Sequence, residues 1–167
     1  MKVLIVSDTH RLNGTLQTVI EKEKPFDLFF HLGDAEGSED LITEWCREQN
    51  ALCQVHMVAG NNDFFSALPR ENEVRIGPYK AFLTHGHLYN VSVGTSRLLD
   101  EAKDRKAQLA IYGHTHRPQL AKRDDVMILN PGSLSFPRQE GRRPSYMLLE
   151  LDEAGEIHCR LQYLTVY

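Results

Sequence analysis

The sequence predicts an α/β protein in which helices cover a core of β-strands, and two observations carry that prediction. Short apolar runs of strand length alternate with segments whose apolar residues recur at helical spacing. The later part of the chain contains instead pairs of strand-like segments separated by turn residues. The alternation predicts a layered fold. The added hairpins favour a mixed sheet, or two packed sheets with outer helices, over a purely parallel sheet.

The predicted parallel strands are apolar runs of strand length. Runs that are apolar almost throughout suit strands covered on both faces. His31 and His56 lie inside two of these runs, and we expect both to be structural. The runs are Val3–Val6, Leu28–Leu32, Val55–Ala59, Ala81–Leu83 and Leu109–Tyr112.

Three segments between these runs predict helices. In the first, Leu16, Val19 and Ile20 recur at helical spacing after Asn13, which we expect to cap the helix. The second follows Ser38, another candidate cap, and its first turn is acidic, as the helix dipole favours. Its apolar residues are Leu41, Ile42, Trp45 and Cys46, and those of the third helix are Leu98, Leu99 and Ala102.

Three hairpins are predicted in the second half of the chain. Gly77-Pro78 separates Val74–Ile76 from Tyr79–Thr84, as a tight turn would. Asp124-Asp125 and Ala154-Gly155 mark the other two turns. Their flanking segments are Gln119–Lys122 with Val126–Asn130, and Tyr146–Leu151 with Ile157–Tyr163.

Length and composition bound the function. The chain has 167 residues, of which 41% are hydrophobic and 25% charged, so we expect a single globular domain over residues 1–167. The net charge of −4 argues against bulk nucleic-acid binding. No apolar run approaches the roughly 18 residues of a membrane span, and Val3–Val6 is too short for a signal-peptide core. Cys46, Cys53 and Cys159 fit neither a zinc motif nor a disulfide framework, which favours a cytoplasmic protein.

Each of the five apolar runs ends at polar residues that can bind ligands. In open α/β sheets, sites lie beyond the carboxyl ends of the strands. Five strands ending alike would therefore bring two aspartates, an asparagine and several histidines together. The segments are Ser7-Asp8-Thr9-His10, Gly33-Asp34, Gly60-Asn61-Asn62-Asp63, Thr84-His85-Gly86-His87 and Gly113-His114-Thr115-His116.

The residue types at these ends indicate metal chemistry. Imidazole and carboxylate ligands without cysteine suit borderline-to-hard divalent ions. Asp8 and His10, like His114 and His116, are two residues apart, so on an extended chain they share a face at roughly 6–7 Å. That span can straddle two ions separated by roughly 3.5–4 Å. Asp34, the lone acid of its loop, has two oxygens and can bridge such a pair.

These motifs, in this order, resemble the calcineurin-like metallophosphoesterase superfamily. The short length, the Thr84–His87 run and Asn130-Pro131-Gly132-Ser133 are similar to its small bacterial and archaeal phosphodiesterase branch. The resemblance extends from Val3 to about Arg138. It implies two packed mixed sheets flanked by helices, a four-layer α/β/β/α sandwich.

The resemblance also implies a dinuclear metal centre. In the family pattern Asp8, His10 and His116 would hold one ion, and Asp34 would bridge it to the second. The second ion would be held by Asn61, His85 and His114. Mn²⁺ is the first choice for both ions, with Ni, Fe, Zn and Mg as alternatives.

One position departs from the family pattern. Many members have a histidine after the ligand asparagine that assists the leaving group, but Asn62 stands there in this chain. Asn62 cannot exchange a proton near neutral pH, so the general acid is unassigned, and His87 is the candidate for the acid or a phosphate contact. The catalytic set is therefore Asp34, Asn61 and His87.

Two loops add candidate substrate contacts. The segment from Asn130 to Ser133 is either a plain turn or a backbone site facing the metals or a phosphate. The loop with Arg138, Arg142 and Arg143 is either solvated or supplies an arginine to a phosphate. The predicted substrate contacts are Asn62, Ser133 and Arg138.

The predicted function is metal-dependent hydrolysis of a small phosphodiester by an activated water or hydroxide. One alternative is a non-catalytic scaffold like the retromer subunit that resembles this branch, although a scaffold has no reason to keep every ligand. The other is a phosphomonoesterase, which would favour extra cationic contacts, and the strand-end motifs contain no basic cluster. The expected assembly is a homodimer or a higher homo-oligomer.

Overall fold

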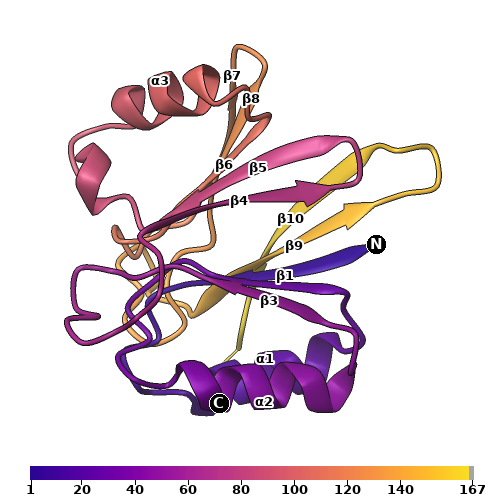
Figure 1. Ribbon diagram of the computed structural model, residues 1–167. Coiled ribbons are helices and arrows are strands. Elements are labelled where there is room, and N and C mark those ends of the chain that lie inside the picture. The colour runs from indigo at the N-terminus through magenta and orange to yellow at the C-terminus, as the bar shows by residue number, and fades with distance from the viewer. Residues whose placement is uncertain (166–167) are drawn as a thin grey trace.

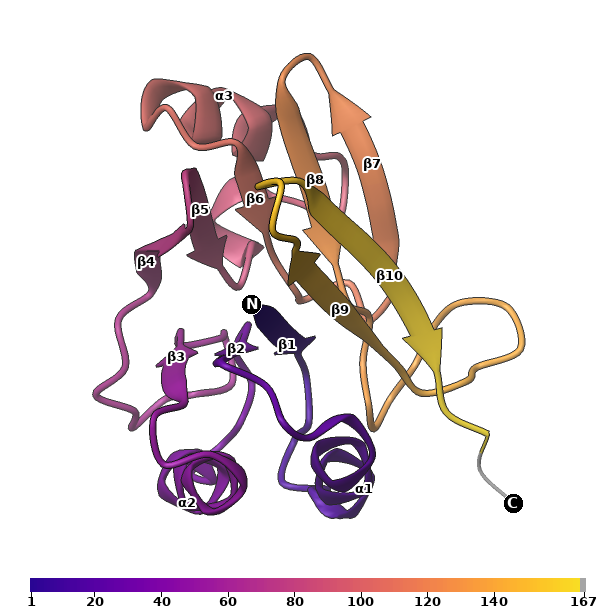
Figure 2. The same ribbon diagram turned by 90° about the vertical axis from the view of Figure 1, so that its right-hand side faces the viewer.

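Two five-stranded sheets pack face to face in the computed structural model, which describes residues 1–165, and helices cover both outer faces (Figures 1 and 2). The helices α1 (Gly14–Glu23) and α2 (Glu39–Gln49) lie on the first sheet, and α3 (Ser96–Asp104) lies on the second. The predicted α/β class, with two mixed sheets between helices, is confirmed. No helix among the described residues is long and apolar enough to cross a membrane.

The first sheet has β1 at its centre and the strand order β10-β9-β1-β2-β3. β1, β2 and β3 run parallel, and β9 joins the other edge of β1 in the antiparallel sense. The parallel register pairs Val6 with His31 and His31 with Met57, so the three strands end at one level. The bounds are β1 (Lys2–Val6), β2 (Leu28–His31), β3 (Gln54–Met57), β9 (Ser145–Leu151) and β10 (Ile157–Tyr163).

The second sheet has the order β4-β5-β6-β8-β7. β5, β6 and β8 run parallel, while β4 and β7 close the two edges as hairpin partners. Together with β9 and β10, these pairs confirm the three predicted hairpins. The bounds are β4 (Glu71–Ile76), β5 (Tyr79–Thr84), β6 (Leu109–Ile111), β7 (Gln119–Arg123) and β8 (Val126–Asn130).

The side chains of β1 alternate between the two faces of its sheet, so the strand packs against both the second sheet and the helices. Val3 and Ile5 pack in the core between the two sheets, whereas Leu4 and Val6 pack in the core beneath α1 and α2. All four side chains are fully buried. Successive strand residues point to opposite faces, so an unbroken apolar run is what a strand between a sheet and a helix layer requires.

Two expectations about local structure are met only in part. β3 lies at the edge of its sheet and exposes part of its length, because its second neighbour position is unfilled. Asn13 and Ser38 occupy the N-cap positions of α1 and α2, as predicted, but neither side chain bonds to its own helix. Instead Asn13 Nδ2 donates to Ser38 Oγ over 2.8 Å, which ties the two helix starts to each other.

Candidate metal centre

The loops that follow the parallel strands of both sheets gather at one end of the molecule, on the left in Figure 1. Backbone hydrogen bonds join the loops directly. Asp8 N–H donates to Gly33 O, His10 N–H donates to Asp34 O, and Gly113 N–H donates to His85 O. Between the sheets, His114 N–H donates to Asp8 Oδ2 over 3.1 Å, so the predicted convergence of strand ends occurs where the two sheets meet.

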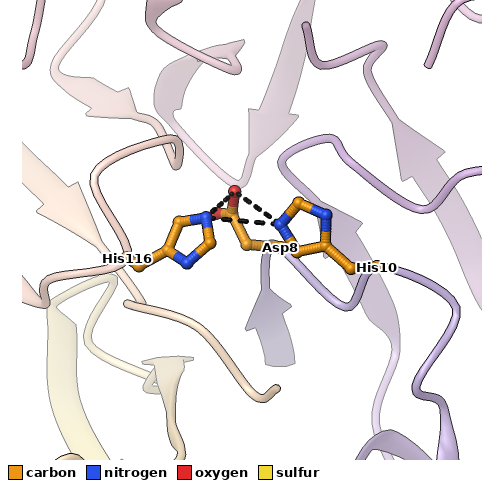
Figure 3. A group of neighbouring side chains, drawn as sticks. All are labelled: Asp8, His10 and His116. Carbon is orange, nitrogen blue, oxygen red and sulfur yellow. Dashed lines mark hydrogen bonds and ion pairs between the residues drawn. The ribbon is translucent and has the colours of Figure 1, made fainter. Parts of the chain in front are cut away.

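The first candidate ligand group consists of Asp8, His10 and His116 (Figure 3). His116 Nε2 lies 3.1 Å from Asp8 Oδ1 and 3.3 Å from His10 Nε2. His10 Nε2 lies 3.9 Å from Asp8 Oδ1. Three potential donor atoms thus face a common point, although His116 comes from the far half of the chain.

The second group consists of Asp8, Asp34 and His85, all buried. His85 Nε2 lies 3.5 Å from Asp34 Oδ2 and 3.9 Å from Asp8 Oδ1. Asn61 Oδ1 adjoins this group at 3.0 Å from His85 Nε2 and 2.8 Å from His114 Nδ1. All seven predicted ligand positions therefore lie together, with Asp8 common to both groups.

The histidine rings are oriented by bonds on their outer nitrogens. The Nδ1 of His85 bonds to Leu32 O over 2.6 Å, and the Nδ1 of His116 bonds to Phe136 O over 2.8 Å. His10 Nδ1 contacts the Glu36 carboxylate over 2.6 Å. Such partners fix the tautomer and direct the other nitrogen inward, as metal-binding histidines require.

Most of the predicted ligand residues adopt a backbone conformation that side chains disfavour. A residue other than glycine with φ in the left-handed region costs energy, and such residues concentrate at functional sites. Only a surrounding structure that fixes them firmly keeps them there. The values of φ are 55° at Asp8, 45° at His10, 60° at Asp34, 69° at His114 and 56° at His116.

The surroundings of the Asp8 carboxylate indicate whether a cation fits the site. It is fully buried, and its Oδ1 atom has no hydrogen-bond partner. Burial by itself raises the pKa of Asp8, but the close contact with the His116 ring and the nearby charges of His85 and His116 outweigh burial and lower it. A buried anion with a free oxygen, facing imidazole nitrogens, suits a divalent ion, so the donor set fits.

Burial and nearby charges shift the pKa values of the other histidines of the site in different directions. Burial lowers the pKa of His116, but its close contact with the Asp8 carboxylate outweighs that effect and raises the pKa overall. The pKa of His114 is lowered by burial and by His85. The pKa of His87 is also lowered, first by burial and then by His85 and His114.

Asp63 has a positioning role that the sequence did not reveal. Its Oδ2 accepts from the N–H groups of Asp34 and Gly60, both over 2.7 Å, and its Oδ1 accepts from Glu36 N–H over 2.6 Å. One buried carboxylate therefore holds the loops after β2 and β3 together. The only available signal was its place two residues after Asn61.

Asn62, predicted to contact substrate, bonds to Asp34 with both of its donors. Its backbone N–H donates to Asp34 Oδ1 over 2.9 Å, and its side-chain Nδ2 donates to Asp34 Oδ2 over 2.8 Å. The loop is tight here, because a Cβ on Gly60 would lie 2.1 Å from Asp34 Oδ1.

Ser133 and His87 occupy very different positions. Ser133 is fully buried and donates from Oγ to Asp8 O over 2.8 Å, so it supports the loop after β1. Its substrate contact stays a prediction. His87 is half-buried, with its ring centroid 5.4 Å from that of His85 and 6.2 Å from that of His114. Its Nδ1 is buried without a hydrogen-bond partner.

Arg138 lines a depression of about 730 Å³ that opens directly beside His10 and His116. Arg142 lines it too, as does Arg117, which the sequence did not single out. Arg143 instead stacks over the Tyr163 ring at 5.0 Å. A basic cluster therefore borders the site, although no strand-end motif contains one.

Comparison with known proteins identifies the family. Residues 1–154 match the model of the calcineurin-like phosphoesterase superfamily domain. A probable metallophosphoesterase of Bacillus subtilis, YsnB, is 33% identical over 153 residues, which cover 91% of this chain and 85% of that protein. The phosphodiesterase MJ0936 of Methanocaldococcus jannaschii is 30% identical over 148 residues, or 79% of this chain and 83% of that one.

A solved structure of a protein named Vps29 has the same fold. A single mutant of Vps29 from Entamoeba histolytica superimposes with a TM-score of 0.75 at 23% identity, covering 99% of this chain and all of that one. The chain belongs to the calcineurin-like phosphoesterase superfamily. Its class is that of hydrolases acting on phosphoester bonds.

Proposed function

We propose that the protein is a metal-dependent phosphodiesterase with a dinuclear centre. The observation that carries the proposal is the Asp8 carboxylate, buried, unpartnered at Oδ1 and common to both candidate ligand groups. The phosphodiesterase MJ0936, similar over most of this chain, supports the choice of a diester. The substrate class is a small phosphodiester.

The ligands divide between two ions. Asp8, His10 and His116 would hold the first, and Asn61, His85 and His114 the second, with Asp34 shared between them. When bound, such ions lower the pKa of a water molecule towards neutrality and offset charge on the phosphoryl oxygens. Mn²⁺ is our choice among the divalent ions that imidazole and carboxylate ligands accept.

The protein's own residues position the reactants around that centre. Asn62 holds both oxygens of Asp34, and Asp63 holds the backbone of the same loop. His87 has a lowered pKa, so it is neutral near pH 7 and serves better as a hydrogen-bonding contact to the ester than as a stored proton. With weak help for the leaving group, the enzyme should favour esters whose leaving groups have low pKa values. Comparable rates on alkyl and aryl diesters would contradict this preference.

Two rival functions have support of their own. The Vps29 neighbour is compatible with a protein-interaction scaffold on this fold. A scaffold does not need an unpartnered buried carboxylate, and this feature favours the enzyme. The arginine cluster beside His116 would suit a phosphomonoester, which carries more negative charge than a diester.

The test is hydrolysis of bis-p-nitrophenyl phosphate by the purified chain. We expect activity to disappear after chelation and to return with Mn²⁺. Asp34→Asn and His114→Ala should both abolish it, whereas Asp125→Asn and His158→Ala should not, because these exposed residues lie away from the centre. A folded protein that binds Mn²⁺ but hydrolyses no diester with any divalent metal would overturn the proposal.

Assembly and location complete the proposal. Cys46, Cys53 and Cys159 are free thiols, which supports a reducing cytoplasm as the place of action. A homodimer or a higher homo-oligomer remains our prediction, and light scattering after size-exclusion chromatography would measure the number of subunits.

A further inference from the structure

The depression beside the metal centre is lined by two predicted metal ligands and by a loop that carries arginines. Its volume is about 730 Å³, which exceeds what one phosphoryl group needs. His10 and His116 form the wall nearest the centre. The remaining lining residues are Arg117, Ser135, Phe136, Pro137, Arg138 and Arg142.

Hydrogen bonds fix this loop to the centre. His116 bonds from Nδ1 to Phe136 O, and its own carbonyl oxygen accepts from Arg138 N–H over 3.0 Å. Ser135 Oγ donates to Thr9 O over 2.8 Å, on the loop that carries Asp8 and His10. The arginine-bearing segment therefore keeps its position relative to the first ligand group.

The guanidinium charges in the depression are not neutralised by the protein. Within residues 1–165, no carboxylate lies within ion-pair distance of Arg117, Arg138 or Arg142. Arg105, on the far side of the second sheet, pairs with both Glu71 and Glu101 at 2.6 Å. All three arginines of the depression are exposed and free to bind an anion.

Charge balance indicates what that anion is. A phosphodiester carries one negative charge, and two divalent ions already offset it. Three further cations beside the centre exceed the need of a simple diester, whereas guanidinium groups match phosphate oxygens in pairs. We propose that the depression binds a second phosphate group of the substrate, so that the substrate class is a phosphodiester with an additional phosphate on one arm. The inference rests on the proposed diesterase function.

Two substrates that differ only in that phosphate provide the test. They are thymidine 5′-(p-nitrophenyl phosphate) and the same ester with a 3′-phosphate. We expect wild type to prefer the phosphorylated ester. In the double variant Arg138→Ala/Arg142→Ala, the ratio of the two kcat/KM values should fall about 10–100-fold, the size of losing charge-assisted hydrogen bonds. Arg97→Ala, which removes the same charge from α3, should leave the ratio unchanged.

Other outcomes overturn the inference in distinguishable ways. An equal loss on both esters would mean that the arginines act on the reacting phosphate. The monoester p-nitrophenyl phosphate is assayed alongside the two diesters. If the double variant lost activity on this monoester alone, the depression would bind the phosphate of a monoester. Failure of wild type to cleave either ester counts against the diesterase itself. Calorimetric binding then decides the subsite: with Mn²⁺, thymidine 3′,5′-bisphosphate must bind more tightly than the 5′-monophosphate in wild type, and the double variant must lose that difference.

Discussion

The two candidate ligand groups share Asp8 but differ in what surrounds them. The group with His10 and His116 lies beside the arginine depression, and a side chain, Glu36, orients one of its rings. The group with Asp34 and His85 is buried, and its histidine ring is oriented by a backbone carbonyl. The first group therefore opens onto the depression, while Asp34 and His85 lie in the interior, next to the exposed Asn61 and the half-buried His114. Mutations should affect the two halves differently.

The largest loss of activity is expected from substitution of Asp8, which belongs to both candidate ligand groups. Asp8→Asn removes the negative charge that both groups use, so we expect kcat/KM on bis-p-nitrophenyl phosphate to fall at least about 10³-fold. Metal content measured after gel filtration should fall as well. Asp27→Asn, an exposed acid preceding β2, is the matched control. A variant that kept both its metal and its activity would mean that Asp8 is not a metal ligand.

The next prediction concerns how the free energy of unfolding depends on pH, and it examines the buried residue His31. His31 is buried, and burial lowers its pKa to about 4 from 6.5. Between those values the unfolded chain binds more protons than the folded one, so stability falls as the pH drops from 6.5 towards 4. The expected loss from His31 is about 3 kcal/mol. Urea unfolding of the chelated protein measures it.

The titrating residue is then identified by substitution. His31→Gln can keep the bonds that the ring makes to Thr9 and Gly33, but it cannot titrate. We expect a flatter dependence on pH for this variant, and wild-type behaviour for His158→Gln, whose ring is exposed. Equal slopes in wild type and His31→Gln would refute the assignment.

Glu36→Gln is expected to disturb the open half alone. The carboxylate contacts His10 Nδ1 over 2.6 Å, and loss of such a partner typically costs 10–100-fold in metal affinity or activity. We expect weaker Mn²⁺ binding of that size by calorimetry, with one ion affected more than the other. Glu48→Gln, on α2 and exposed, provides the control. If the binding of both ions weakened equally, the result would argue against two distinguishable halves.

Gly60→Ala is expected to disturb the enclosed half. The added Cβ would lie 2.1 Å from Asp34 Oδ1, so the loops after β2 and β3 must separate. Overpacking of this kind typically costs 1–3 kcal/mol of stability, and activity should fall because Asp34 moves. Gly14→Ala, with nothing within 4 Å of the added carbon, should leave both unchanged or raise stability slightly. Equal behaviour of the two variants would contradict the steric argument.

The sequence predicted the convergence of strand ends because parallel strands end at one edge whatever their order. That reasoning needed neither the strand order nor the register, and it placed Asp8, Asp34 and His116 in one region. The burial expected for β3 is met only in part, because a run such as Val55–Ala59 does not show whether its strand lies at the edge of its sheet. The positions of the caps Asn13 and Ser38 were predicted, but their bond to each other was not, since the two residues meet only after folding.

The supporting residues of the site were harder to predict than its ligands. Asp63 acts through three backbone N–H groups, and backbone partners leave no pattern in a sequence. The arginine depression draws Arg117 from one loop and Arg138 with Arg142 from another. Their proximity depends on the bond between Arg138 N–H and His116 O, which only the tertiary structure brings about.

The position of β1 has a consequence for how the chain is made. This first strand lies between β2 and β9, and its register pairs Lys2 with Glu150. During synthesis, one edge of β1 therefore has no partner until the strand at residues 145–151 leaves the ribosome. Unpaired strand edges invite wrong partners in incomplete chains. The loop with Asp8 also waits for His114 and Ser133, so the candidate metal centre is complete only after both residues have been made.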